Sequence, residues 1–183
     1  MRIARARILA VAVAIGAVVA TTVAGGAAIA GDPFGHDSFR ERLTGYQEDP
    51  ATLSTTGVGD FRLSINDRAH TITYRLSYSS LEGNVLQAHI HLGQPAQSGG
   101  IIVFLCTNLG NGPAGTQACP AAPATVTGTL AAGDVIGPAA QGITAGQFNE
   151  LVAAIRAGAT YANVHSTLYP SGEIRAQLED GHH

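Results

Sequence analysis

The stretch TYANVHSTLYPSGEIRAQLE, residues 160–179, predicts two antiparallel strands joined by a turn. Side chains alternate between the two faces of a strand. The apolar set of this stretch is Ala162, Val164, Ile174, Ala176 and Leu178, and the polar set is Tyr161, Asn163, His165, Glu173, Arg175 and Gln177. A register with His165 opposite Glu173 keeps all polar side chains on one face, whereas a one-residue slip would mix the faces. We therefore place the polar set on the outer face of a sheet and the apolar set on the face that packs against the core.

The rest of the chain repeats this pattern of short strands and turns. Strands are expected at 38–46, 57–65, 70–78, 85–92, 100–106 and 124–130, with Gly, Pro, Asn, Asp and Ser between them. The run 100–106 is continuously apolar, which is typical of a central strand buried on both faces. Frequent short strands favour an all-β sandwich or barrel.

One segment, residues 145–157, has helical periodicity instead. Its apolar residues are Phe148, Leu151, Val152 and Ile155, at positions i, i+3, i+4 and i+7. Thr144 and Gln147 suit a capping box, and Gly158 suits the position after the helix end. We expect a short helix that packs this stripe against an end or edge of the β structure.

The N-terminal region predicts export. Residues 1–30 combine three arginines with a long apolar run that ends in Ala-Ile-Ala, so we expect a signal peptide cleaved before Gly31. The alternative is an uncleaved membrane anchor, because the run is long enough to span a bilayer. After cleavage no membrane span is expected. We expect residues 31–37 to be a flexible leader, 38–179 one domain, and 180–183 a tail.

Export makes the two cysteines interpretable. Cys106 and Cys119 flank a polar, glycine-rich segment, and an even cysteine count in an oxidising compartment predicts one disulfide.

The charge pattern and motifs exclude several functions. The chain has 10 basic and 13 acidic residues, a net charge of −3, and no basic stripe, so no nucleic-acid partner is expected. No Ser-His-Asp order, paired-carboxylate cleft or phosphate loop supports hydrolase or transferase chemistry. The sequence therefore predicts no enzyme of those classes; an extracellular protein or a cell-envelope component is the expected partner.

The stretch AHIHL, residues 88–92, places His89 and His91 on the face opposite its apolar residues. If this strand neighbours the 160–179 hairpin, both imidazoles meet His165, with Glu173 close by. Imidazole nitrogen suits copper and zinc. We predict a divalent metal site whose three imidazole nitrogens lie about 3–4 Å apart, and somewhat farther without metal.

Further residues complete this prediction. We expect Glu173 either to bind the metal or to accept a hydrogen bond from a histidine ligand. We expect Asn163, Arg175 and Tyr161 to surround and orient the ligands. Protons should weaken such a site as the pH falls through the ordinary imidazole pKa of about 6.5. The alternative is a solvated histidine face without convergence. The remaining histidines are bystanders, although the terminal pair can bind metal adventitiously: His36, His70, His182 and His183.

The chain resembles the chordin-type (CHRD) domain family, as a single-domain secreted member of bacterial type. The matching pieces are LTGYQEDPATLSTTGVGDFRL, YRLSYSSLEGNVLQAHIHLGQPAQSGGIIVFLC, VTGTLAAGDVIGPAAQGI and FNELVAAIRAGATYANVHSTLYPSGEIRAQL, in family order over residues 39–178. The His-x-His-x-Gly and Asn-x-His…Gly-Glu-Ile-Arg pieces together are specific. The family's proline-rich turn after the first Glu is here EDPAT, a small departure.

The resemblance implies a secreted or cell-surface domain with an immunoglobulin-like, Greek-key antiparallel β-sandwich and one short helix before the last two strands. It matches His89, His91, His165 and Glu173 to positions where the family carries those residue types. It implies no settled reaction. In chordin these domains lie between cysteine-rich modules that bind growth factors, which suggests a binding or scaffold role.

Two functions are therefore expected. The first is an exported metal-binding domain that holds copper or zinc. The second is an extracellular interaction or structural module without metal or catalysis, whose same polar face contacts a partner. A remote third is oxidant turnover, because the His-x-His-x-Gly strand is also similar to Cu/Zn superoxide dismutase; the wider dismutase ligand set is missing from the sequence.

Overall fold

The structure is a computed structural model that describes residues 37–179. The strands are β1 (Ser38–Thr44), β2 (Val58–Asn66), β3 (Thr71–Ser79), β4 (Val85–Leu92), β5 (Ile101–Thr107), β6 (Ala124–Leu130), β7 (Thr160–Ser166) and β8 (Ile174–Leu178). One α-helix, α1 (Phe148–Arg156), and three 3-10 turns, η1 (Gly45–Gln47), η2 (Ala132–Asp134) and η3 (Ala139–Gln141), complete the described elements. The predicted signal peptide, its cleavage site before Gly31, most of the leader, and the tail lie outside these residues.

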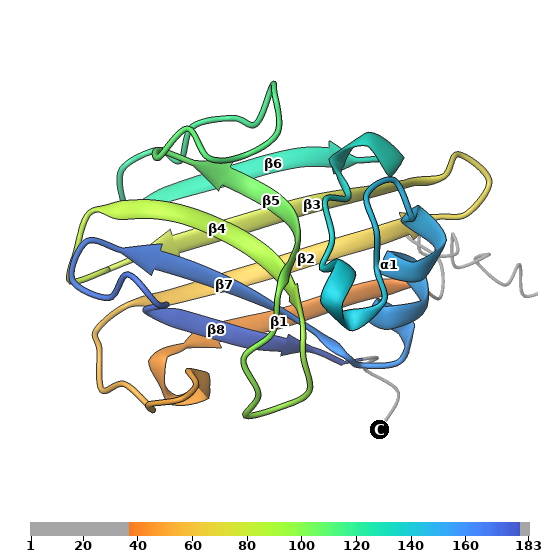
Figure 1. The fold of residues 1–183 in the computed structure, drawn as a ribbon. Helices are drawn as coiled ribbons and strands as arrows, with labels where there is room; N and C mark the ends of the chain where they lie inside the picture. Colours follow the sequence, from red (N-terminus) through yellow and green to blue (C-terminus); the bar gives the residue numbers. More distant parts are fainter. Residues whose placement is uncertain (1–36, 180–183) are drawn as a thin grey trace, which may run out of the picture. The chain divides into compact units, whose positions relative to one another are not determined.

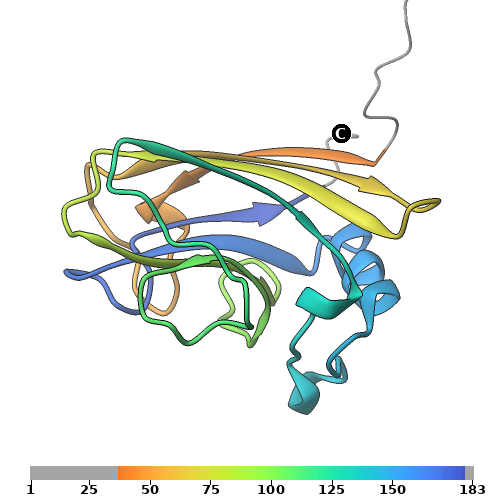
Figure 2. The ribbon, with the colours of Figure 1, turned by 90° about the horizontal axis from the view of Figure 1, so that it is seen from above.

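The eight strands form one antiparallel sheet in the order β5-β4-β7-β8-β1-β2-β3-β6. The sheet turns over on itself where β8 meets β1, at the single pair Thr44–Arg175. Its two halves, β5-β4-β7-β8 and β1-β2-β3-β6, then face each other in a nearly barrel-shaped arrangement (Figures 1 and 2). The all-β prediction is confirmed, while the immunoglobulin-like Greek-key topology stays a prediction.

The core lies between the two halves. Alternation sends every second side chain inward, and the β2–β3 register sets Phe61 beside Leu76 and Ile65 beside Ile72. From the other half, Ile90 and Ile174 enter the same core. Each such fully buried apolar side chain stabilises the fold by about 1.5–3 kcal/mol.

Strand β5 is an edge strand, not the central strand that its apolar run predicts. It is nevertheless buried on both faces. Its free edge is covered by irregular chain, because Ile136 N–H donates to the Ile102 carbonyl and Thr107 N–H donates to the Gln117 carbonyl. The disulfide between Cys106 and Cys119 ties this covering loop to β5 and confirms the predicted pairing.

Helix α1 lies at one end of the sheet, near the β2–β3 turn (Figure 1). Its buried residues are the four predicted ones, Phe148, Leu151, Val152 and Ile155. The predicted start is wrong by three residues, because Gly146 has a φ of +85°, outside the helical region. Half of the predicted capping box remains: Thr144 N–H donates to Gln147 Oε1 over 2.6 Å. Within residues 37–179, no helix has the length and apolar character needed to cross a bilayer.

Candidate metal site

The three strands that carry the predicted site are neighbours. Strand β4 pairs with β7, and β7 pairs with β8. The predicted hairpin register is confirmed, with Asn163 opposite Arg175 and Tyr161 opposite Gln177. Across the other ladder, His89 lies opposite Asn163 and His91 opposite Tyr161. The polar sets of all three strands therefore share one face.

This polar face points away from the core but is not solvated. Relative exposures are 0% for His89, 8% for His91, 6% for His165 and 2% for Arg175. The alternative of a solvated histidine face is therefore wrong. Two loops cover the face, and neither was expected from strand alternation, which describes only which side a residue points to.

The first covering loop joins β4 to β5, residues 93–100. Arg175 Nη2 donates to the carbonyls of Gln94 and Gln97, at 3.1 and 3.0 Å. Gly99 N–H donates to the Tyr161 hydroxyl over 3.1 Å, and Gln177 Nε2 donates to the Gly93 carbonyl over 2.9 Å. The polar side chains of the sheet thus satisfy the backbone groups of the loop that buries them.

The second covering loop follows β1, residues 45–57, and supplies two further groups. Thr55 Oγ1 donates to Glu173 Oε1 over 2.8 Å. Glu48 accepts from Asn163 Nδ2 through both carboxyl oxygens, at 2.9 and 3.2 Å. Gly172 permits this approach: its φ is +138°, and a Cβ there would collide with Asn163 Nδ2 and the Glu48 carboxyl group.

The three histidines converge as predicted. His89 Nδ1 lies 3.1 Å from His165 Nε2. One ring nitrogen from each of His89, His91 and His165 can be chosen so that all three lie within 4.8 Å of one another. Two ligands of one tetrahedral zinc ion are about 3.3–3.4 Å apart for bonds of about 2.0–2.1 Å. A separation of 4.8 Å must therefore close by roughly 1.5 Å before one ion can contact all three rings.

Backbone carbonyls set the tautomers of two rings. His91 Nδ1 lies 2.9 Å from the Gly99 carbonyl, and His165 Nδ1 lies 2.9 Å from the Pro170 carbonyl. Because a carbonyl oxygen only accepts, both Nδ1 atoms carry the proton and both Nε2 atoms carry a lone pair. This arrangement is the one by which metal-binding histidines are usually oriented, with the second ring nitrogen donating to a carbonyl.

Two ring nitrogens have no partner. His89 Nε2 and His91 Nε2 are buried and accept or donate no hydrogen bond. An unsatisfied buried polar atom costs about 1–3 kcal/mol. His165 Nε2 accepts from His89 Nδ1, so each of the three neutral rings presents one nitrogen lone pair, and two of these lone pairs are orphaned.

Aromatic side chains shape the walls of the cluster. The His91 ring stacks on Tyr161, with centroids 4.8 Å apart and planes within 4°. The Arg175 guanidinium lies 3.5 Å from the Tyr161 ring centroid. Phe104 of β5 meets His89 edge to face at 4.4 Å. These contacts hold two of the rings in place and replace water around them.

Burial keeps the imidazoles neutral. It lowers the pKa of His89 to about 2 and that of His91 to about 4, and the neighbouring imidazoles and Arg175 act in the same direction. The pKa of His165 is also lowered by burial. The ordinary pKa of about 6.5 expected from the sequence therefore does not describe this cluster. Neutral rings are the form that binds metal.

Glu173 and Glu48 are buried, but their hydrogen bonds within residues 37–179 go to residues other than the three histidines. Glu173 does not belong to the group of ligand atoms within 4.8 Å; its Oε1 accepts from Thr55 and from Glu82 N–H, and its Oε2 has no hydrogen-bond partner. Glu48, which sequence reasoning missed, accepts from Asn163, the residue opposite His89 in the β4–β7 ladder. Burial raises the Glu48 pKa to about 8, against the opposing charge of Arg175. Its only signal in the sequence is its place in the family piece LTGYQEDPAT.

Comparison with known proteins places the whole domain in one family. The family model described as the CHRD domain matches residues 39–178. No curated protein and no solved structure matches the chain. The matched span includes the whole sheet except Ser38, both covering loops and the three histidines, so the resemblance expected from the sequence extends over nearly the complete fold. The chain belongs to the CHRD domain family.

Proposed function

We propose that this CHRD domain binds one divalent transition-metal ion, copper or zinc, through His89, His91 and His165. The observation that carries the proposal is the pair of orphaned Nε2 atoms beside a third imidazole lone pair. Among residues 37–179, this is the one group of three metal-ligating side chains that converge. An ion there would give the unsatisfied nitrogens a partner.

The donor set favours copper or zinc over harder ions. Imidazole nitrogen suits copper and zinc, whereas calcium and magnesium take oxygen ligands. Three neutral imidazoles leave a fourth position, as in open zinc sites. The tautomers of His91 and His165 already point Nε2 lone pairs away from their carbonyl partners, so these two rings need no proton transfer to bind.

The burial of the polar face favours a metal site over the alternative function of an interaction module. A surface that binds a protein partner must be accessible before binding, but the side chains of the polar face are covered by residues 93–100 and 45–57. We propose further that the protein acts outside the cytoplasm, in secreted or cell-envelope form. The Cys106–Cys119 disulfide supports this location, because such bonds persist in oxidising compartments.

Calorimetric titration tests the metal site. The full chain carrying His182→Ala and His183→Ala, purified without a tag and treated with chelator, is titrated with Zn²⁺ and separately with Cu²⁺. We expect one site per chain. His165→Ala should weaken it at least about tenfold, since changes to groups that merely orient ligands already cost about 10–100-fold.

The matched control is His70→Asn, a histidine outside the cluster with a φ of +51°, a conformation that asparagine tolerates. This variant should bind as the parent does. Metal at about 100 times its Kd should also stabilise the parent by about 2.7 kcal/mol in unfolding experiments. Equal affinity in the parent and His165→Ala, or no binding by either ion, contradicts the proposal.

A further inference from the structure

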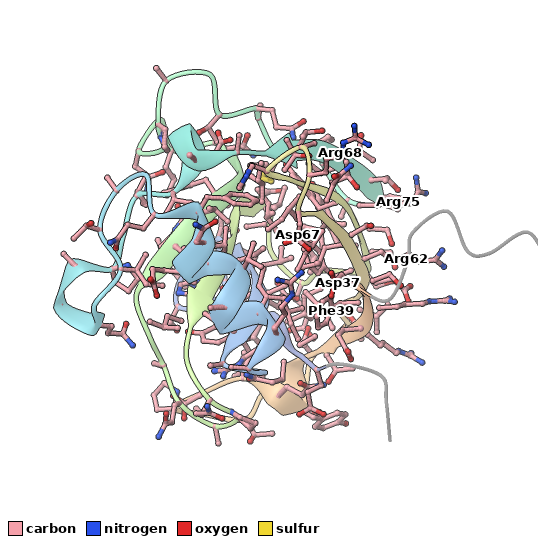
Figure 3. The ribbon with its side chains drawn as sticks, turned by 90° about the vertical axis from the view of Figure 1, so that its right-hand side faces the viewer. Asp37, Phe39, Arg62, Asp67, Arg68 and Arg75 are labelled. Carbon is pink, nitrogen blue, oxygen red and sulfur yellow. A yellow bond between two sulfur atoms is a disulfide. The ribbon has the colours of Figure 1, made fainter. Side chains whose placement is uncertain are left out.

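A row of arginines crosses the outer face of the β1-β2-β3-β6 half. Strand pairing places Arg40 directly opposite Arg62, and Arg62 directly opposite Arg75. We call Arg40, Arg62 and Arg75 the arginine row. Neighbouring strands lie about 4.8 Å apart, so the row spans about 10 Å. Figure 3 shows Arg62 and Arg75 reaching away from the molecule on the same side.

Within the described residues, the row forms no ion pair with an acidic side chain. All three side chains are exposed. Among residues 37–179, the ion pairs within 4.0 Å are those of Arg156 with Asp37 and Asp67. Inside that same range, the side-chain hydrogen bond from the row is a long contact of 3.5 Å from Arg75 to Thr125 Oγ1.

This placement is unfavourable for the fold alone. Like charges directly opposite each other on neighbouring strands are destabilising. The chain is acidic overall, with a net charge of −3. Yet Arg42, which lies directly opposite Asp60 of β2, is on the same face, so four of the seven arginines within residues 37–179 gather there. An anionic ligand would remove the repulsion within the row.

Two depressions flank the row and suit a chain-like ligand. One has a volume of about 390 Å³ and is lined by the row together with Ser38, Phe39, Leu63, Ser64, Thr73 and Tyr74. The other has a volume of about 320 Å³ and is lined by the row together with Asp60 and Ser77. Guanidinium groups bind sulfate, phosphate and carboxylate through paired hydrogen bonds. Hydroxyl side chains beside them can bond to sugar hydroxyls.

We propose that the arginine row binds an acidic polysaccharide through its sulfate, phosphate or carboxylate groups. Two other polyanions fit less well. Within residues 37–179 the large apolar side chains that are exposed are Tyr46, Leu109, Ile136 and Leu168, and none lies on β1, β2, β3 or β6. The aromatic residues beside the row, Phe39 and Tyr74, are buried, so the face lacks exposed aromatic platforms for stacking bases. It also lacks the apolar anchors by which proteins insert into a lipid surface.

Dextran sulfate is the probe for this proposal, with fluorescence anisotropy of a labelled sample as the readout and the full chain as the protein. We expect binding at low salt that weakens steeply as salt is added. Arg62→Gln should weaken it at least about fivefold and make the logarithmic salt dependence shallower by about one unit, since one cation is lost. Arg68→Gln, the same charge change in the β2–β3 turn, should weaken it less than about twofold.

Stability measurements separate ligand binding from a structural role. Arg62→Gln removes the repulsion from both neighbours, so its urea midpoint should equal or exceed that of the parent. Arg62→Lys keeps the charge but loses the paired hydrogen bonds, and should bind with intermediate affinity. Absent binding at low salt, or equal affinity of the parent and Arg62→Gln, overturns the proposal. Tighter binding to oligothymidylate or to phosphatidylglycerol vesicles at the same salt also overturns it, because the ligand is then a nucleic acid or a membrane.

Discussion

His89 Nδ1 lies 3.1 Å from His165 Nε2, although 76 residues separate the two histidines along the chain. The β4–β7 ladder produces this contact. Gln87 pairs with His165 and His89 with Asn163, so the two imidazoles are diagonal neighbours on one face. Diagonal neighbours across a sheet are within reach of long and aromatic side chains.

Metal affinity should change little between pH 8 and pH 6. The pKa values of about 4 for His91 and about 2 for His89 leave both rings neutral in this range, so protons do not compete with the ion. An exposed histidine trio would lose affinity as the pH falls through about 6.5. Calorimetric titration at pH 8, 7, 6 and 5 distinguishes a buried histidine cluster from an exposed one. A tenfold loss already at pH 6 would show that the rings titrate as exposed histidines do.

Glu48 should make the protein less stable as the pH rises from about 4.5 to about 8. Within this window the folded state retains a proton that the unfolded state has lost, because the pKa rises from 4.5 to about 8 on folding. The free energy of unfolding therefore falls with rising pH. Glu48→Gln removes this dependence, so the variant should gain relative to the parent between pH 5 and pH 9 in urea unfolding.

Glu150→Gln, on the exposed side of α1, provides the control and should follow the parent at every pH. If Glu48→Gln and the parent change in parallel, the Glu48 carboxyl group is ionised in the fold and its raised pKa is wrong.

Leu151→Ala should destabilise the protein by about 2–5 kcal/mol, because Leu151 is fully buried and its removal leaves a cavity. Chemical denaturation measures the loss. Asn149→Ala changes an exposed position of the same helix and should stay within about 0.5 kcal/mol of the parent. An unchanged midpoint for Leu151→Ala would mean that α1 does not pack on the sheet.

The disulfide should be present in protein from an oxidising compartment. Intact mass with alkylation should show no free thiol before reduction and two after it. Replacing both cysteines with alanine should destabilise the fold by about 3 kcal/mol, as expected for closing a loop of about this length. Two freely alkylated thiols in unreduced protein would contradict the pairing.

Local patterns in the sequence predicted much of the fold. Alternation is a property of each strand, so the phase of His89, His91 and His165 followed from it. The predicted strands 85–92 and 124–130 match the bounds of β4 and β6. The hairpin register followed from keeping the polar residues on one face. The apolar stripe of α1 followed from helical period, although the positive φ of Gly146 shortened the helix.

Non-local pairing decided what no local pattern contains. Alternation states which side a residue faces, not what covers that side, so the burial of the histidines under residues 93–100 and the capture of Glu48 by Asn163 were not predictable. For the same reason the apolar run of β5 predicts a central strand, although β5 is an edge strand covered by loops.

The arginine row illustrates the same limit. Arg40, Arg62 and Arg75 are far apart in a sequence that shows no basic stripe, and only the registers of β1 on β2 and β2 on β3 align them. By itself the sequence determined the strands, their faces, the helix stripe, the disulfide pair and the family. The tertiary structure alone decided which sheet faces are buried and which charged side chains lie side by side. Both depend on the strand order and the loop paths, which bring distant residues together.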